Sequence, residues 1–288
     1  MKGFKLTIHP IMVCVLLMPF LSLAATLRVW TNSSRLADPY DSRSYAAHEI
    51  QAAIDAASDG DVVLVANGSY VVTTAVVVAK AVVVRSVSGP DLTVVDGNHS
   101  SRCFYIDHTN AVIEGFTIRN GYSLYSGGGV RIASGGTIRD CVIAGNRAEI
   151  NGGGLLIEHD EGVIENCVIR QNSAGGGGGV YMQSGGCLSG CLVSSNGVRW
   201  TGGGIQCRYG GMVRNCVISH NSSRASGGGI WSGGGTIENC VISRNRAWYN
   251  SVAVGGGVVS VGARVRNCTI AYNSCDDYGG GMYVRGGG

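Results

Sequence analysis

The sequence predicts an all-β protein, a single-stranded parallel β-helix whose coils each take about 25 residues. Two repeated blocks carry this prediction, a Gly-Gly-Gly triplet and a ten-residue segment between triplets. Apolar residues alternate with a period of two in the residues that follow each triplet and in the ten-residue segment. The triplets occupy 127–129, 152–154, 177–179, 202–204, 227–229, 255–257 and 279–281, at spacings of 25, 25, 25, 25, 28 and 24 residues. Such alternation indicates half-buried strands rather than helices. We expect two or three short strands in each coil.

The ten-residue block reads TIRDCVIAGN at 137–146 and returns in related forms at 163–172, 187–196, 212–221, 236–245 and 264–273. An earlier variant, AVIEGFTIRN at 111–120, is interpreted with Gly115 in place of the cysteine. The period is too short for a propeller blade of about 40 residues, and the leucine-rich repeat signature is absent. Stacked coils therefore place like residues in columns along the axis.

One of these columns consists of cysteines at Cys141, Cys167, Cys191, Cys216, Cys240 and Cys268. Neighbouring coils are separated by about 4.8 Å, whereas a disulfide needs Cβ atoms about 3.8 Å apart. We therefore expect buried free thiols that pack as small hydrophobes. No metal is expected there, because the sequence has no CxxC pair and no Cys/His cluster.

Asparagines form two further columns, and the glycine triplets mark another corner. One column ends each block, at Asn146, Asn172, Asn196, Asn221, Asn245 and Asn273, after Asn120 in the earlier variant. The other precedes the cysteine, at Asn166, Asn215, Asn239 and Asn267. Asparagine tolerates left-handed backbone and stacked amides can form hydrogen-bonded ladders. The glycines suit positive φ or close backbone approach.

The N-terminal part divides into a predicted signal peptide at 1–24 and a segment at 25–61 that holds a capping helix. Lys2 and Lys5 precede an apolar run that ends in the small-x-small sequence of residues 22–24. This run is shorter than the roughly 20 residues of a membrane span, so we expect no transmembrane helix and an exported protein. Residues 47–57, AHEIQAAIDAA, have one apolar helical face and should cover the end of the core. The β-helix is then expected over 62–288, truncated at its C-terminus, with any anchor or sorting signal beyond Gly288.

Composition excludes several classes of protein. Glycine contributes 47 of 288 residues but proline only 4, hydrophobic residues reach 45% and charged residues 14%. These values do not fit collagen, a disordered chain or a coiled coil. The formal net charge of +3 includes the two signal lysines, and Lys80 is the only later lysine. A nucleic-acid partner is therefore not expected.

The densest acidic segment supplies weak candidates for chemistry. Glu158, His159, Asp160 and Glu161 are consecutive, and Arg131 lies one coil earlier. Glu158, His159, Asp160 and Arg131 are the candidate catalytic residues, with Arg131 or His159 as a base. Glu158, Asp160 and Glu161 could bind calcium, which is the only cofactor considered. The alternative is a solvated loop, since charged residues usually lie outside.

A row of residues that follows the glycines is expected to point outward: Arg131, Leu156, Tyr181, Gln206, Trp231, Val259 and Tyr283. Tyr181, Trp231 and Tyr283 are the candidate ligand-binding residues, because outward aromatic rings can stack on sugars or anchor a protein partner. Ordinary β propensity also enriches aromatics in strands. A parallel row of alternating charge, from Arg139 to Arg266, should keep its sheet soluble and in register.

These segments resemble a known superfamily. The capping helix, GDVVLVANGSY, VVVRSVSGPDLTVVDG and AVIEGFTIRNG resemble the start of exported bacterial right-handed β-helix proteins of the pectin-lyase-like superfamily. The GGG[VLI] and NC[VT]I repeats are similar to those of polymorphic outer-membrane adhesins. The resemblance implies a right-handed coil and a polysaccharide or cell-surface glycan as partner. It leaves the activity open, because the superfamily includes lyases, hydrolases and non-catalytic adhesins.

The leading functional hypothesis is an exported surface protein, extracellular or on the outer cell surface, that is adhesin-like or glycan-binding and has no recognisable catalytic set. The alternative is a polysaccharide lyase or hydrolase that acts on uronic-acid-containing glycans. A purely structural spacer is the third possibility.

Overall fold

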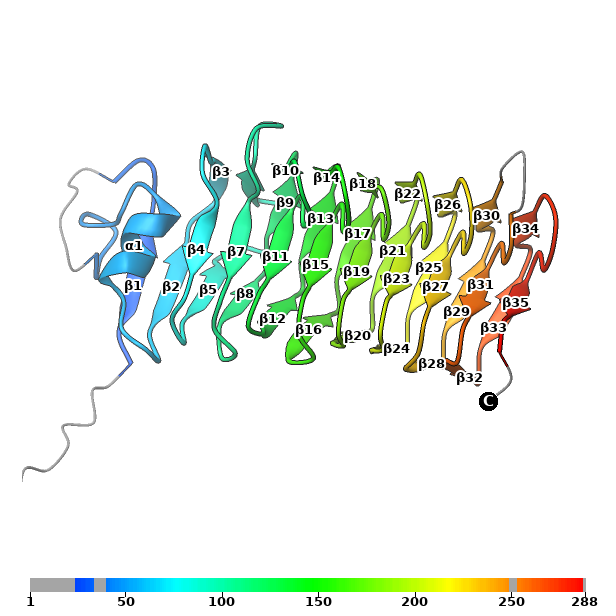
Figure 1. The fold of residues 1–288 in the computed structure, drawn as a ribbon. Coiled ribbons are helices and arrows are strands. Elements are labelled where there is room, and N and C mark those ends of the chain that lie inside the picture. The colour runs from blue at the N-terminus through cyan, green and yellow to red at the C-terminus, as the bar shows by residue number, and fades with distance from the viewer. Residues whose placement is uncertain (1–23, 34–39, 249–252, 287–288) are drawn as a thin grey trace, which may run out of the picture.

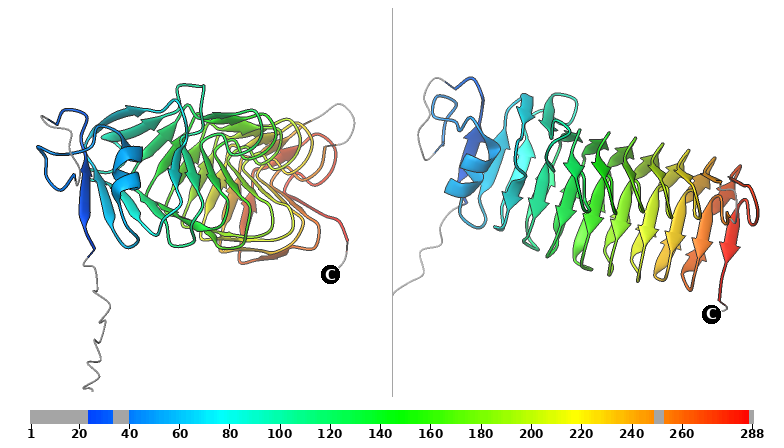
Figure 2. Two further views of the ribbon diagram at one scale, coloured as in Figure 1. Left: turned by 60° about the vertical axis from the view of Figure 1, so that its left-hand side comes forward. Right: turned by 45° about the horizontal axis from the view of Figure 1, so that its top comes forward.

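The molecule is an elongated, right-handed parallel β-helix, seen in a computed structural model that describes residues 24–33, 40–248 and 253–286. The helix α1 (Ile50–Ala56) lies at one end of the stack and the last strands lie at the other (Figure 1). Figure 2 shows from two further directions that strands of successive coils lie side by side along the axis. The fold prediction is confirmed. Residues 1–23 of the predicted signal peptide lie outside the described residues.

Four parallel sheets run along the axis in the described residues, and we call them sheets A to D. Sheet A contains β1 (Thr26–Val29), β2 (Val62–Val65), β5 (Val83–Ser86), β8 (Val112–Glu114), β12 (Gly136–Arg139), β16 (Gly162–Glu165), β20 (Cys187–Ser189), β24 (Met212–Arg214), β28 (Thr236–Glu238) and β32 (Arg264–Arg266). Sheet B contains β3 (Gly68–Val71), β6 (Thr93–Asp96), β9 (Thr117–Arg119), β13 (Val142–Ala144), β17 (Val168–Arg170), β21 (Leu192–Ser194), β25 (Val217–Ser219), β29 (Val241–Ser243) and β33 (Thr269–Ala271).

Sheet C contains β4 (Val76–Val78), β7 (Phe104–Ile106), β11 (Val130–Ile132), β15 (Leu155–Ile157), β19 (Val180–Met182), β23 (Ile205–Cys207), β27 (Ile230–Ser232), β31 (Val258–Ser260) and β35 (Met282–Val284). Sheet D contains β10 (Tyr122–Ser123), β14 (Arg147–Ala148), β18 (Ser173–Ala174), β22 (Gly197–Val198), β26 (Ser222–Ser223), β30 (Arg246–Ala247) and β34 (Ser274–Cys275). A regular coil thus visits sheets A, B, D and C in turn. The expectation of two or three strands missed the two-residue strand of sheet D.

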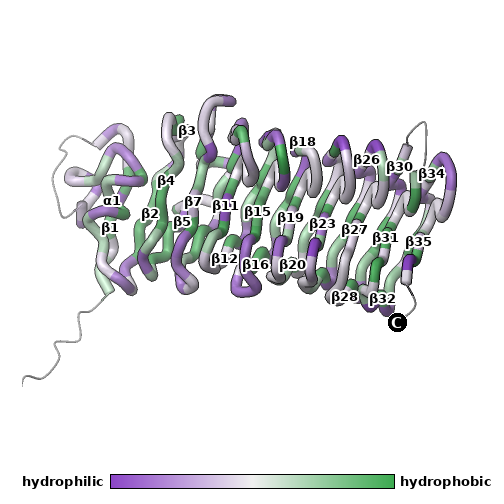
Figure 3. Tube along the Cα trace, viewed as in Figure 1, coloured by the Kyte–Doolittle hydropathy of each residue, from purple (hydrophilic) through white to green (hydrophobic). Residues whose placement is uncertain are grey.

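The core lies inside the coils and consists of stacked apolar rows. Ile138 pairs in register with Ile164, and Ile164 with Leu188. All three side chains are fully buried, while the residues on either side of them face outward, as period-two alternation requires. Figure 3 shows hydrophobic residues along the strands and hydrophilic residues in many of the connecting turns.

The cysteine column is present as predicted. The described cysteines are free, and five of the six column members are buried; Cys268, in the last complete block, is half-buried. The backbone N–H of Cys167 donates to Sγ of Cys191, and that of Cys191 to Sγ of Cys216, each over 3.4 Å. The thiols therefore pack and hydrogen-bond along the axis without being cross-linked.

The buried thiols make stability depend on pH in the alkaline range. Burial raises the pKa of Cys103 and of Cys207, each to about 12 from an ordinary value of 9.0. Because the folded chain holds these protons more tightly than the unfolded chain, their stabilisation is complete below about pH 9 and is lost as pH rises toward about 12. We expect the urea midpoint to fall between about pH 8 and about pH 11, and to fall less in Cys207→Val. Equal falls in the two proteins would contradict this assignment.

Both asparagine columns are present, but the register of the 111–120 block was predicted wrongly. Val112 pairs with Thr137, so Phe116 occupies the cysteine position, and its N–H donates to Sγ of Cys141 over 3.4 Å. Gly115 instead takes the bend before it, with φ of 78°. The asparagines that end the later blocks form a hydrogen-bonded ladder, in which the backbone N–H and Nδ2 of Asn146 donate to Oδ1 of Asn172, and we call them the ladder asparagines. Asn120 is not one of them: it has φ of 53°, and Gly121 takes the first position of the ladder. A glycine and an asparagine suit either position, which explains the shift by one residue.

The capping helix is shorter than predicted, Ile50–Ala56 instead of 47–57, but buries the expected face. Ile50, Ala53 and Ile54 are buried against the first coils. Strand β1, which the sequence analysis did not identify, extends sheet A beneath the helix through its pairing with β2. The Nζ of Lys80 donates to the carbonyls of Ile54, Asp55 and Ala57 over 2.6–3.0 Å. This lysine therefore satisfies the free carbonyls at the end of the helix.

Candidate ligand-binding groove

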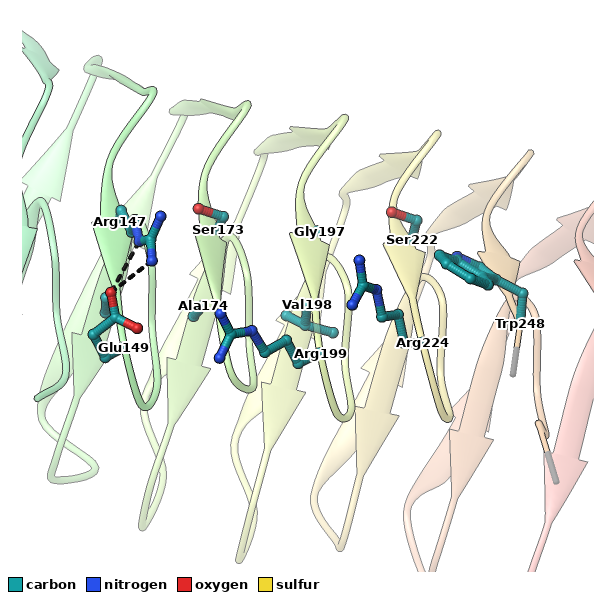
Figure 4. Close-up of a pocket in the computed structure, with 11 residues that line it drawn as sticks. Arg147, Glu149, Ser173, Ala174, Gly197, Val198, Arg199, Ser222, Arg224 and Trp248 are labelled. Atoms are coloured by element: carbon teal, nitrogen blue, oxygen red, sulfur yellow. Dashed lines mark hydrogen bonds and ion pairs between the residues drawn. The ribbon is translucent and has the colours of Figure 1, made fainter. Parts of the chain in front are cut away.

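Sheet D carries a groove of about 400 Å³ that runs along the axis of the β-helix. Figure 4 shows its side chains, which come from five successive coils. We call it the sheet-D groove, and its lining consists of Arg147, Ala148, Glu149, Ser173, Ala174, Gly197, Val198, Arg199, Ser222, Arg224 and Trp248. Four coil steps of about 4.8 Å give it a length near 19 Å.

The groove forms because three residues follow each ladder asparagine before the chain turns back toward sheet C. The second of these points inward, so Ala148, Ala174 and Val198 are buried. The first and third positions face outward. Along the middle of the groove the first position holds only small residues, Ser173 and Gly197, so the floor stays open between the larger side chains of the third position.

The first coil of the groove is electrically balanced. Nη2 of Arg147 lies 2.7 Å from Oε1 of Glu149, and the Tyr122 hydroxyl donates to the same oxygen over 3.4 Å. The hydrogen bond from Arg147 lowers the pKa of Glu149 below its ordinary value. Glu149 is therefore ionised at neutral pH and compensates Arg147.

The remaining coils of the groove carry uncompensated positive charge. Among the described residues, no ion pair joins the Arg199 or the Arg224 guanidinium to an acid, although the charge of Arg199 still acts on the Glu149 carboxylate and helps to lower its pKa. Cζ of Arg224 lies 5.4 Å from the centre of the Trp248 ring, a cation–π contact. The indole is 38% exposed, and so an aromatic surface remains accessible at this end. The groove thus offers exposed cations, an aromatic ring and serine hydroxyls to a ligand.

The predicted catalytic residues lie elsewhere: Arg131 is on β11 of sheet C, and the acidic segment that begins at Glu158 forms the turn between sheets C and A. Nη2 of Arg131 is 2.9 Å from Oε1 of Glu158, and Cζ of Arg131 is 5.4 Å from the Tyr105 ring centre. His159, Asp160 and Glu161 are exposed. Within residues 24–33, 40–248 and 253–286, no three His, Cys, Asp or Glu side chains gather in a way that could hold a metal ion. A catalytic or calcium-binding role for this turn stays a prediction.

The predicted outward row on sheet C is largely covered, which corrects the expectation for Tyr181. Only 2% of Tyr181 is exposed, and its hydroxyl accepts a hydrogen bond from Nη1 of Arg208 over 3.3 Å. A Cβ on Gly177 would lie 2.9 Å from the Cβ of Tyr181, so the glycine corner of the same coil packs against this side chain. Trp231 and Tyr283 are half-buried. Ligand binding by this row stays a prediction, although Tyr181 offers no free ring face.

Sequence reasoning overlooked the groove because the residues after each ladder asparagine were interpreted only as connections. The repeat register could have revealed the groove, because it aligns the residues that follow each ladder asparagine in columns. The third residue after each ladder asparagine is Glu149, Gly175, Arg199, Arg224, Trp248 or Asp276. Reading this column would have shown two arginines and a tryptophan on consecutive coils.

Comparison with known proteins identifies the fold. The model of the "Right handed beta helix region" family matches residues 102–288. The crystal structure of pectate lyase Pel9A superimposes with a TM-score of 0.54 at 15% sequence identity, covering 82% of this chain and 68% of that one. No curated protein matches the sequence. In the described residues no helix is long and apolar enough to cross a bilayer.

Proposed function

The chain belongs to the right handed beta helix region family, and from that premise we propose that it is an exported surface protein whose sheet-D groove binds a polysaccharide. The observation that carries this proposal is a groove crossing five coils, with arginines, serines and an exposed tryptophan in one line. A linear polymer can follow such a repeating surface coil by coil. Export rests on the features of residues 1–24.

The lining suits a sugar chain in three respects. Its volume of about 400 Å³ falls in the usual range for sites of small ligands, about 300–1,000 Å³. The Trp248 indole offers an apolar ring face with a polar edge, which suits stacking on a sugar. The hydroxyls of Ser173 and Ser222 make no hydrogen bond with another described residue, so they are free to bond to a ligand.

Binding is favoured over cleavage at this site. Among the lining residues Glu149 is the only carboxylate, and Arg147 already neutralises it. A glycoside hydrolase of the usual kind needs two carboxylates across the scissile bond. The likeness to a pectate lyase supports the fold, and it is compatible with a polysaccharide ligand.

Replacing Trp248 with alanine should weaken binding to a responsive polysaccharide by about five- to thirtyfold, the equivalent of losing about 1–2 kcal/mol of ring contact. The measurement is a glycan array followed by affinity electrophoresis of the intact protein. Trp231→Ala is the matched control, because it removes a half-buried tryptophan from sheet C. Loss in Trp231→Ala alone would move the site to sheet C, and no binding by the unaltered protein would refute the proposal.

A further inference from the structure

On sheet A, several stacked arginines are neutralised by acids of the neighbouring coils. On sheet A, Glu114 lies between Arg85 and Arg139, with N–O distances of 3.0 and 2.6 Å. On the last coils of the same sheet, Nε of Arg266 donates to Glu238 over 2.7 Å. Stacked charges on neighbouring strands here alternate in sign, as a stable sheet requires.

Sheet D departs from that arrangement at two consecutive coils. The N–H of Arg199 donates to the carbonyl of Ala174, and the N–H of Arg224 donates to that of Val198, so the two arginines occupy the same position one coil apart. The acids that border them are already paired, Glu149 with Arg147 and Asp276 with Arg246. The two side chains therefore start from backbone positions one coil apart, about 4.8 Å along the axis, and like charges at such neighbouring positions repel each other unless an anion compensates them.

The two side chains point the same way. Figure 4 shows Arg199 and Arg224 both reaching along the groove toward the preceding coil, with the Trp248 ring behind Arg224. The ring contact with Trp248 orients the Arg224 guanidinium within the lining of the groove. An anion between the two coils would meet donors from both arginines.

We propose that Arg199 and Arg224 form a clamp for a tetrahedral oxyanion, a sulfate or phosphate ester carried by the polysaccharide. A guanidinium presents paired N–H donors that match two oxygens. A carboxylate has two oxygens, which the paired donors of one guanidinium satisfy. A sulfate or phosphate ester has three free oxygens and can therefore accept hydrogen bonds from two guanidinium groups. This inference rests on the proposed function and adds the chemical class of the ligand.

The clamp needs no bridging metal ion. The positive charge is supplied by the arginines themselves, and the free lining surface between them carries only small or uncharged residues. Binding should therefore weaken with added salt and be indifferent to a chelator such as EDTA.

The test compares polymers that differ only in their ester. The intact protein is titrated by biolayer interferometry with dextran sulfate, phosphorylated dextran, polygalacturonate and neutral dextran, each with EDTA present. We expect sulfated or phosphorylated dextran to bind at least about tenfold more tightly than polygalacturonate. Which ester binds more tightly identifies the source of the oxyanion, and equal binding of polygalacturonate would overturn the clamp.

Matched variants separate the clamp from general charge attraction. Arg199→Gln/Arg224→Gln should lose at least about tenfold in affinity for the preferred ester. The control Arg170→Gln/Arg264→Gln removes the same charge from exposed positions on sheets B and A and should change affinity by less than about twofold. Equal losses would overturn the clamp. A protein that binds neutral sugars through Trp248 but ignores the ester would refute only this inference, whereas binding to no polysaccharide would refute the proposed function.

Discussion

Replacing Asn196 with alanine should lower the free energy of unfolding by about 3–5 kcal/mol. The side chain is 1% exposed. Its Oδ1 accepts from the backbone N–H and from Nδ2 of Asn172, over 2.9 and 3.0 Å, and its own Nδ2 donates to Ile169 and Asn221. Alanine would leave two buried N–H groups of Asn172 without acceptors, and each such group costs about 1–3 kcal/mol. Urea denaturation followed by circular dichroism measures the change.

Asn215→Gly is the matched control for this prediction. Asn215 belongs to the other asparagine column, is exposed and has φ of 54°, a backbone conformation that glycine adopts freely. Its replacement should change the unfolding free energy by less than about 1 kcal/mol. If Asn196→Ala cost no more than the control, the ladder would not be a source of stability.

The period of the sequence was sufficient to predict the columns, because a parallel β-helix repeats one environment at each coil. The thiols and ladder amides at Cys167 and Asn172 lie where the spacing placed them. The register failed only at 111–120, where Gly115 and Asn120 suit both the position assigned to them and its neighbour. The backbone preferences of these two residues do not distinguish the two registers, and only the pairing of Val112 with Thr137 decides between them.

The site was harder to predict than the fold, because alternation says which side of a strand a residue faces but not what covers it. Tyr181 faces away from the core as expected, yet the glycine corner and Arg208 bury it. A two-residue strand such as β22 is too short to show alternation at all. Glu149 forms its ion pair with Arg147, and among the described residues Arg199 forms none; both facts depend on side-chain positions that no spacing specifies.

Replacing Gly203 with alanine should cost more than about 3 kcal/mol and should disrupt the stacking of the adjoining coils. The first glycine of each triplet is needed for its positive φ, 70° at Gly202, but Gly203 is needed for another reason. A Cβ there would lie 2.3 Å from the carbonyl oxygen of Gly228 and 2.5 Å from that of Ser222. Both obstacles are backbone atoms of the next coil, so no side-chain rotation can relieve the clash, and the coil itself must move.

Gly234→Ala tests whether this cost comes from close approach or simply from the loss of a glycine. The nearest atom to a Cβ on Gly234 is the Tyr209 carbonyl oxygen at 3.6 Å, an ordinary contact. Its substitution should leave the unfolding free energy within about 1 kcal/mol, because alanine also lowers the entropy of the unfolded chain. Similar urea midpoints for the two variants would mean that the coils can separate at the triplets. The triplets would then be flexible connections, and the stacked columns that place Arg199 beside Arg224 would lose their structural basis.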